Sequence, residues 1–148
     1  MRLGFFAHEC DPDAAGIDIS RLEACSQSGL PLCLEQPGPH EAVLPSLNEI
    51  EINLVCDPLI AKVHEEFMDD PTATDVITFQ HGEIFVSIET AIRCAGVNSH
   101  PATREAVLYV IHGFLHLNGH SDSTEEEGAA MNRVQESILL TVWPFPER

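Results

Sequence analysis

The stretch from residue 112 to residue 122 reads His112-Gly113-Phe114-Leu115-His116-Leu117-Asn118-Gly119-His120-Ser121-Asp122. Apolar residues from Ala106 to Leu117 repeat at helical spacing, so we expect a long buried helix that begins near Pro101 and ends at Gly119. Histidines four positions apart on a helix differ by about 40° around its axis. The side chains of His112 and His116 therefore face one site.

A metal ion explains two imidazoles in so apolar a helix better than a buried, hydrogen-bonded histidine pair does. Gly119 can turn the chain so that Asp122, six residues after His116, supplies a third ligand. The spacing His-x-x-x-His-x-x-Gly-x-x-ligand is the one that metzincin-type metalloenzymes use. His120 competes for this place as a nitrogen donor one turn beyond His116, but Gly119 should end the helix before it. We favour Asp122.

Gly113 occupies the position after the first histidine, where metallopeptidases of this spacing carry a glutamate as general base. A glycine has no side chain that can move a proton, so we do not expect proteolysis by that route. An ion with three protein ligands still keeps a position for water, and the pattern therefore favours a metal-dependent hydrolase of another kind.

The segments before this helix show the signals of strands. Residues 49–55 alternate polar and apolar side chains, which predicts a half-buried strand. Asp57 as N-cap and Pro58 at the first helical position predict a helix that runs through Phe67. The β-branched and aromatic runs 74–79 and 83–88 predict two strands in close succession.

The sequence before residue 49 is less regular. Residues 17–24 open a helical pattern, which we expect to be short because Pro31 must end or kink it. Residues 37–46 contain three prolines and a glycine, too many for a regular element, so they predict a loop.

Two more helices are expected towards the C-terminus. One covers residues 89–95. Ser123 as N-cap and Glu126 three residues later form a capping box that opens the last helix, and this helix ends before Pro144. With the strands above, this order predicts helices around one mixed sheet, an α+β fold in a single domain over residues 1–148.

Length and composition suit one compact domain. The chain has 148 residues, 44% of them hydrophobic, and no apolar run of the length that a membrane span requires. The N-terminal residues do not supply the apolar region of a secretory signal. Five cysteines, without a Cys-x-x-Cys pair, indicate reduced and mostly buried thiols. We therefore expect a cytoplasmic protein.

The charge balance is strongly acidic, with 7 Lys and Arg against 24 Asp and Glu and a formal net charge of −17. Such a chain repels phosphate at long range. A function on RNA would need local contacts, a bound metal or a protein partner to overcome this field.

Residues 112–122 resemble the signature His-Gly-x-Leu-His-Leu-x-Gly-Tyr-Asp-His of the YbeY family, the bacterial endoribonucleases of rRNA maturation. Residues 74–79 are similar to that family's Pro-Thr-Asp-Val-Leu-Ser-Phe, and the resemblance extends over residues of about 49 to 142. It implies a three-layer α/β sandwich with a mixed sheet of about four strands and one zinc ion in a cleft. It also implies cleavage of single-stranded RNA in 16S rRNA maturation and ribosome quality control.

Three positions depart from the family pattern. The third ligand is usually histidine and is Asp122 here. An arginine that would help to handle RNA phosphate falls at Met68, which cannot make its bidentate contact. The family's Gly-Asp is Gly82-Glu83, with a carboxylate one methylene longer.

These observations give one leading function and two alternatives. The leading function is a zinc-dependent endoribonuclease with one ion per chain, where nickel or iron could replace zinc. Its general base would be Glu83, Asp75 or His64. Its partners would be single-stranded RNA or an rRNA precursor and the small ribosomal subunit or a ribosomal protein, with no membrane or DNA. The alternatives are a non-catalytic metal-binding ribosome-assembly factor and a metallohydrolase, such as a metalloendopeptidase, on another substrate.

Overall fold

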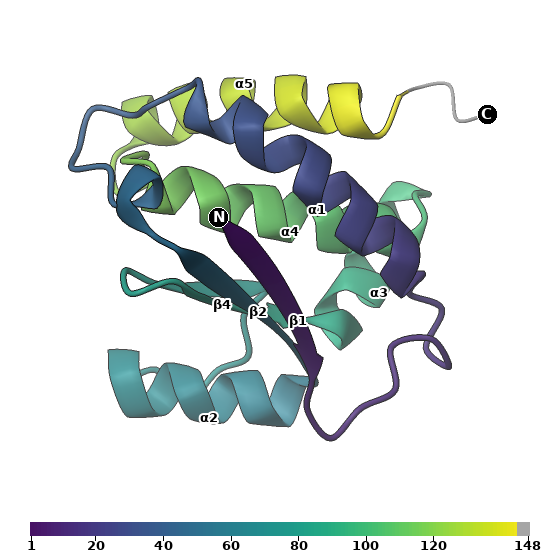
Figure 1. Ribbon diagram of the computed structural model, residues 1–148. Coiled ribbons are helices and arrows are strands. Elements are labelled where there is room, and N and C mark those ends of the chain that lie inside the picture. Colours follow the sequence, from purple (N-terminus) through teal and green to yellow (C-terminus); the bar gives the residue numbers. More distant parts are fainter. Residues whose placement is uncertain (145–148) are drawn as a thin grey trace.

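A mixed four-stranded sheet forms the centre of the computed structural model, which describes residues 1–144 (Figure 1). Its strands, in spatial order, are β1 (Arg2–Ala7), β2 (Glu49–Val55), β4 (Glu83–Ser87) and β3 (Val76–Phe79). Strand β2 is parallel to β1 and β4, whereas β3 runs antiparallel to β4. β1 and β3 are therefore the edge strands.

Helices cover both faces of this sheet. Helix α2 (Asp57–Met68) lies on one face, and α4 (Ala102–Leu117) packs across β3 and β4 on the other (Figure 1). Helices α1 (Ile19–Leu34) and α3 (Ile88–Asn98) pack against α4, and α5 (Glu125–Val142) lies outside α1 and α4. This arrangement confirms the three-layer α+β fold and its mixed sheet of four strands.

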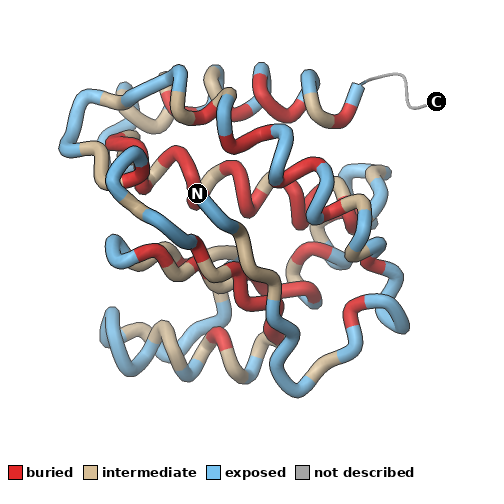
Figure 2. Tube along the Cα trace, viewed as in Figure 1, coloured by how far each residue is buried: buried red, intermediate tan, exposed pale blue. Residues whose placement is uncertain are grey.

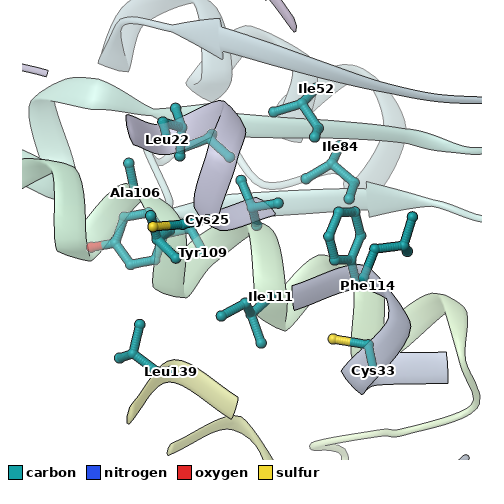
Figure 3. Close-up of a cluster of buried hydrophobic side chains, with 14 of the residues drawn as sticks. Leu22, Cys25, Cys33, Ile52, Ile84, Ala106, Tyr109, Ile111, Phe114 and Leu139 are labelled. Carbon is teal, nitrogen blue, oxygen red and sulfur yellow. The ribbon is translucent and has the colours of Figure 1, made fainter. Parts of the chain in front are cut away.

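Helix α4 is the core helix of the molecule, buried between the sheet and the outer helices (Figure 2). Its Ile111 and Phe114 are fully buried in one cluster with Ile52 of β2 and Ile84 of β4 (Figure 3). The approach to the sheet is close: a Cβ at Gly113 would meet Ile84 Cδ1 at 2.7 Å. Gly113 thus lets α4 reach the depth that the core requires.

A polar network joins the start of α2 to α3. Asp57 Oδ1 accepts hydrogen bonds from the hydroxyls of Ser87 (2.6 Å) and Thr90 (2.9 Å), and Asp57 Oδ2 accepts one from Arg93 Nη1 at 2.7 Å. Burial alone would raise the pKa of Asp57, but these hydrogen bonds outweigh it and lower the pKa below its ordinary value of 3.8. The carboxylate therefore helps to hold the two helices together.

Several sequence predictions are confirmed. Strand β2 has the predicted bounds, although it is more than half-buried, because residues 53–55 are all buried. Helix α4 starts after Pro101 and gives way to Gly119 at φ +93°. Helix α5 ends before Pro144, as predicted.

The prediction that the first helix is short was wrong. Helix α1 contains Pro31 and continues to Leu34. Its last turn is held by tertiary contacts: Cys33 is fully buried, and its carbonyl accepts a hydrogen bond of 2.8 Å from Asn118 Nδ2. Packing therefore outweighs the lost backbone hydrogen bond of the proline.

Element boundaries needed smaller corrections. The N-cap of α5 is Thr124 and not Ser123, since the Thr124 hydroxyl accepts from the Glu127 amide at 3.1 Å. The N-cap of α2 is Cys56, and Asp57 is its first helical residue. Strand β3 starts at Val76, two residues later than predicted, and Ile88 belongs to α3. Strand β1, which the sequence did not predict, pairs only with β2.

The five cysteines are free thiols. Cys25 and Cys33 are buried, and the other three are partly exposed, so the prediction of mostly buried thiols holds for two of the five. Burial raises the pKa of Cys33 to about 12 and keeps this thiol protonated. In the part of the chain that is described, no helix has both the length and the apolar character to cross a membrane.

Candidate metal centre

The last two turns of α4 bring His112 and His116 together. Their side chains are 22% and 24% exposed, and the two rings meet edge to face. The Nε2 atoms lie 2.9 Å apart. The two imidazoles thus face one point, as their spacing on the helix predicts.

The chain then turns at Gly119 and returns Asp122 to the same point. A side chain at Gly119 would collide with the carbonyl oxygen of His40, 2.5 Å from its Cβ, so both the positive φ and the space require glycine. Asp122 Oδ2 lies 3.7 Å from Nε2 of each histidine. His120 points elsewhere, with its Nε2 at 2.6 Å from the carbonyl oxygen of Gln36. His112, His116 and Asp122 form the only group of possible metal ligands among residues 1–144.

Hydrogen bonds fix how the two rings present their nitrogens. His112 Nδ1 donates to Gln135 Oε1 at 2.7 Å, and His116 Nδ1 donates to the carbonyl oxygen of His120 at 3.1 Å. Both partners only accept, so each neutral ring carries its proton on Nδ1 and leaves a lone pair on Nε2. Two lone pairs and a carboxylate oxygen then face one another without a donor, which is the environment of a cation.

The surroundings of His116 favour the neutral form of its ring. Burial lowers the pKa of His116 below its ordinary value of 6.5, and the charge of a protonated His112 lowers it further, although Asp122 acts in the opposite direction. A neutral imidazole is the form that binds metal, so the Nε2 lone pair of His116 stays available.

The separations suit zinc. A tetrahedral zinc ion with bonds of about 2.0–2.1 Å holds its ligand atoms about 3.4 Å apart. The distances of 2.9, 3.7 and 3.7 Å between the three ligand atoms bracket this value. Two imidazoles and one carboxylate are also a donor set of catalytic zinc sites, which keep a further position open.

Two hollows flank the group. One, of about 380 Å³, is lined by the three ligand residues, by Met68, and by residues 74–78 and Gln80 along edge strand β3. The other, of about 340 Å³, lies across His116 and includes Gln80 and residues 119–121. All three ligand residues can therefore be reached from the first hollow, and His116 also from the second.

Of the three residues considered as general base, only Asp75 lines the first hollow. Its Oδ1 accepts hydrogen bonds from the Val76 amide at 2.8 Å and from the Thr74 hydroxyl at 3.3 Å. Glu83 lines a separate hollow and lies 2.6 Å from His81 Nε2. His64 Nδ1 donates to the carbonyl oxygen of Thr72 at 2.9 Å and lines neither hollow beside the ligands.

Met68 occupies a prominent place in the first hollow. This residue is 48% exposed, and the residues that line this hollow include neither lysine nor arginine. The position where the resemblance implies an arginine thus lines the same hollow as the ligand group and carries no charge. Any positive charge for phosphate in this hollow must come from a bound ion or a partner.

The sequence did not point to Gln135 as a residue of the site. It is buried on α5, between Met131 and Ile138 in the apolar stripe of that helix. A glutamine at an inward position of this apolar stripe was the available signal, because buried polar groups require partners. Without the fold, nothing indicated that its partner is His112.

The loop of residues 38–43 supplies no metal ligand, but it clamps the turn that carries Asp122. The amides of Gly38, His40 and Val43 donate to the carbonyls of Asn118, Gly119 and Leu117, at 2.9, 3.0 and 2.8 Å. Gly38 passes so close that a Cβ would lie 2.4 Å from Gly119. His40 Nε2 also lies 2.7 Å from Glu127 Oε2 on α5.

Comparisons with known proteins identify relatives of this chain. An Endoribonuclease YbeY of Rhodopirellula baltica is 36% identical over 103 residues, which cover 63% of this chain and 53% of that protein. One from Moorella thermoacetica is 31% identical over 113 residues, which cover 64% and 72%. A chloroplastic relative from Arabidopsis thaliana is 31% identical over 119 residues, and the match covers 72% of this chain and 20% of the plant protein. The chain thus spans about half the length of the first relative.

A solved structure supports the fold. The solution structure of TM1509 from Thermotoga maritima matches with a TM-score of 0.64 at 21% identity, over 95% of this chain and 89% of that chain. The family model described as Endoribonuclease YbeY matches residues 11–142, so the similarity begins well before residue 49, where the sequence first suggested it. The chain belongs to the endoribonuclease YbeY family, a family of enzymes.

Proposed function

We propose that this protein is a metal-dependent endoribonuclease that cuts single-stranded RNA, with a precursor of 16S rRNA as its substrate. The observation that carries the proposal is the His112, His116 and Asp122 group, whose lone pairs converge beside two hollows. Membership of the YbeY family supports RNA as the substrate class. Roles in rRNA maturation and ribosome quality control follow from the same resemblance, and a reducing cytoplasm suits the five free thiols.

Zinc is the ion that we assign first, at one per chain, and nickel or iron fit the same nitrogen and oxygen donors. When bound, such an ion supplies a water molecule of lowered pKa and neutralises charge that develops on the scissile phosphate. The protein holds the ligand rings through Gln135 and the carbonyl of His120. Asp75, in the same hollow, is the residue that we assign as proton acceptor.

The charge of the chain implies help from a partner. With a net charge of −17 and Met68 in the hollow, this protein lacks the cations that would hold an RNA backbone. A small ribosomal subunit or one of its basic proteins would supply them. The same two observations favour the second candidate function, a metal-binding assembly factor that does not cut RNA.

A peptidase function has less support. Gly113 lies against Ile84, and the Cβ of a glutamate at this position would meet Ile84 Cδ1 at 2.7 Å, so the side chain of Ile84 would have to shift. The packing of α4 on the sheet therefore disfavours the residue type that metallopeptidases of this spacing use as general base.

A cleavage assay on labelled 16S rRNA precursor tests the proposal. Wild type and His116→Ala are compared with and without small subunits, and His81→Ala is the control, because His81 is an exposed histidine outside the ligand group. We expect wild type and His81→Ala to cut the RNA and His116→Ala not to cut it. Small subunits should increase the cleavage. Equal cleavage by His116→Ala would indicate a contaminant or a metal-independent route. Absence of cleavage under both conditions would favour the assembly factor.

A further inference from the structure

Strand β3 is an edge strand, and its register shows which backbone groups it leaves open. The Ser87 amide donates to the Asp75 carbonyl at 2.9 Å, which marks Asp75 and Ser87 as a hydrogen-bonded pair. Such pairs alternate along an antiparallel ladder, so the backbone amides and carbonyls of Ile77 and Phe79 also point towards β4. The amides and carbonyls of Val76 and Thr78 therefore point away from the sheet.

One of these outward groups is already satisfied within the chain. The Val76 amide donates to the carboxylate of Asp75 at 2.8 Å, which confirms that it points outward. The Thr78 backbone takes part in none of the hydrogen bonds that the described residues make outside the ladder. The Val76 carbonyl, the Thr78 amide and the Thr78 carbonyl are thus open to another extended chain.

The open edge runs along the hollow of the ligand group. Thr74 to Thr78 and Gln80 line this hollow together with Asp122. On the α2 side, Phe67 is 63% exposed and packs edge to face on Phe79, with ring centroids 5.2 Å apart. A strand added to β3 would meet an apolar ring on one face and the carboxylate of Asp75 on the other.

The charge around this edge selects the occupant. Asp75 lines the hollow beside the metal ligands, Asp69 and Asp70 follow Met68 in the chain, and neither lysine nor arginine lines the hollow. Away from the ion, these carboxylates repel phosphate, whereas lysine or arginine side chains would pair with them. A polypeptide also offers the alternating donors and acceptors that the β3 backbone requires, which an RNA strand does not.

We propose that the edge of β3 binds an extended, basic segment of a partner protein as a fifth strand of the sheet, along the β3 side of the hollow of the ligand group. Alternate residues of the segment place lysine or arginine towards Asp75 and apolar side chains towards Phe67. This docking goes beyond RNA cleavage and does not depend on it. The second hollow, across His116, stays free for another ligand.

Binding of a labelled octapeptide of alternating valine and lysine to the zinc-loaded full chain tests the proposal by fluorescence anisotropy. Thr78→Pro removes the open amide without touching the ladder to β4, while Thr78→Val keeps the backbone and is its matched control. We expect binding to weaken about tenfold in Thr78→Pro and to change little in Thr78→Val. Equal binding by these two variants would overturn the proposal.

A peptide-side comparison keeps the test independent of whether the proline variant folds. The same octapeptide with alternate N-methyl amides keeps its charges and side chains but loses the donors of one edge. Loss of binding after methylation, and slower hydrogen exchange of the Thr78 amide in the complex with the unmodified peptide, are expected. Undiminished binding of the methylated peptide would contradict strand addition.

Two further arms test the chemistry of the occupant. An octapeptide of alternating valine and glutamate should not bind. Asp75→Asn, which keeps an oxygen for the Val76 amide, should weaken binding of the basic peptide and reduce the dependence of this binding on salt. An oligouridylate octamer that protects the Thr78 amide in place of the peptide would assign the edge to RNA and overturn the proposal. RNA cleavage is measured separately, so its loss would leave the peptide result intact.

Discussion

Gln135 on α5 holds the ring of His112 on α4, because His112 Nδ1 donates to Gln135 Oε1 at 2.7 Å. Replacing the amide with an apolar side chain of similar size, Gln135→Met, should weaken zinc binding about 10–100-fold, since the ring loses its fixed orientation. Competition with a chromophoric chelator measures the affinity. Gln135→Glu keeps the acceptor and should retain tight binding. An unchanged affinity in Gln135→Met would show that the ring is held by packing alone.

The two candidates for the third ligand can be separated directly. Asp122→Ala should lower zinc affinity by more than about 100-fold, because loss of an outer partner alone costs about 10–100-fold. His120→Ala should keep most of the affinity, since its ring contacts Gln36 and only its backbone carbonyl supports His116. Isothermal titration of both variants decides the point, and the reverse ranking would assign His120 as the ligand.

Gly113→Ala should destabilise the protein by about 1–3 kcal/mol, because the new methyl group would meet Ile84 Cδ1 at 2.7 Å. Urea unfolding of the metal-free proteins measures this free energy. Gly96→Ala on α3 is the matched control: a Cβ there meets nothing within 4 Å, so alanine should stabilise by about 0.5–1 kcal/mol. Ile84→Val removes the nearest methyl and should restore part of the loss in Gly113→Ala. Equal effects of the two glycine substitutions would contradict a close approach of α4 to β4.

The Asp57 network predicts a pH dependence. Because the pKa of Asp57 is lower in the folded state than its ordinary 3.8, the ionised carboxylate stabilises the protein at higher pH. This contribution is complete above the unfolded pKa and is lost as the pH falls through the folded value. Asp57→Asn should cost about 1 kcal/mol at neutral pH, and the difference from wild type should shrink below about pH 4. A difference that stays constant with pH would exclude a role for the charge.

Local patterns predicted the parts of the fold that depend on local spacing. The period of a strand relates the polar and apolar alternation to β2. The period of a helix relates the apolar run to α4 and places its two histidines, four positions apart, on one side. The turn at Gly119 follows from the conformations that glycine alone adopts readily. These features were enough to predict that Asp122 would join His112 and His116.

The remaining features depend on contacts between distant residues. Strand β1 is held by pairing with β2, and α1 passes Pro31 because Asn118 and the core hold its last turn. Gln135 joins the site from 23 positions beyond His112. None of these contacts leaves a periodic signal in the sequence, so each required the three-dimensional structure.

Because residues 38–43 clamp the turn after α4, the position of Asp122 depends on the length of this surface loop. Surface loops usually tolerate insertions and deletions, because few of their backbone groups are committed. Here three amides of one segment match three carbonyls of another, and Gly38 lies against Gly119. Related sequences that keep the aspartate should therefore keep the spacing between positions 38 and 43 even where the side chains differ. One inserted residue would move each donor past its acceptor and release the turn that carries Asp122.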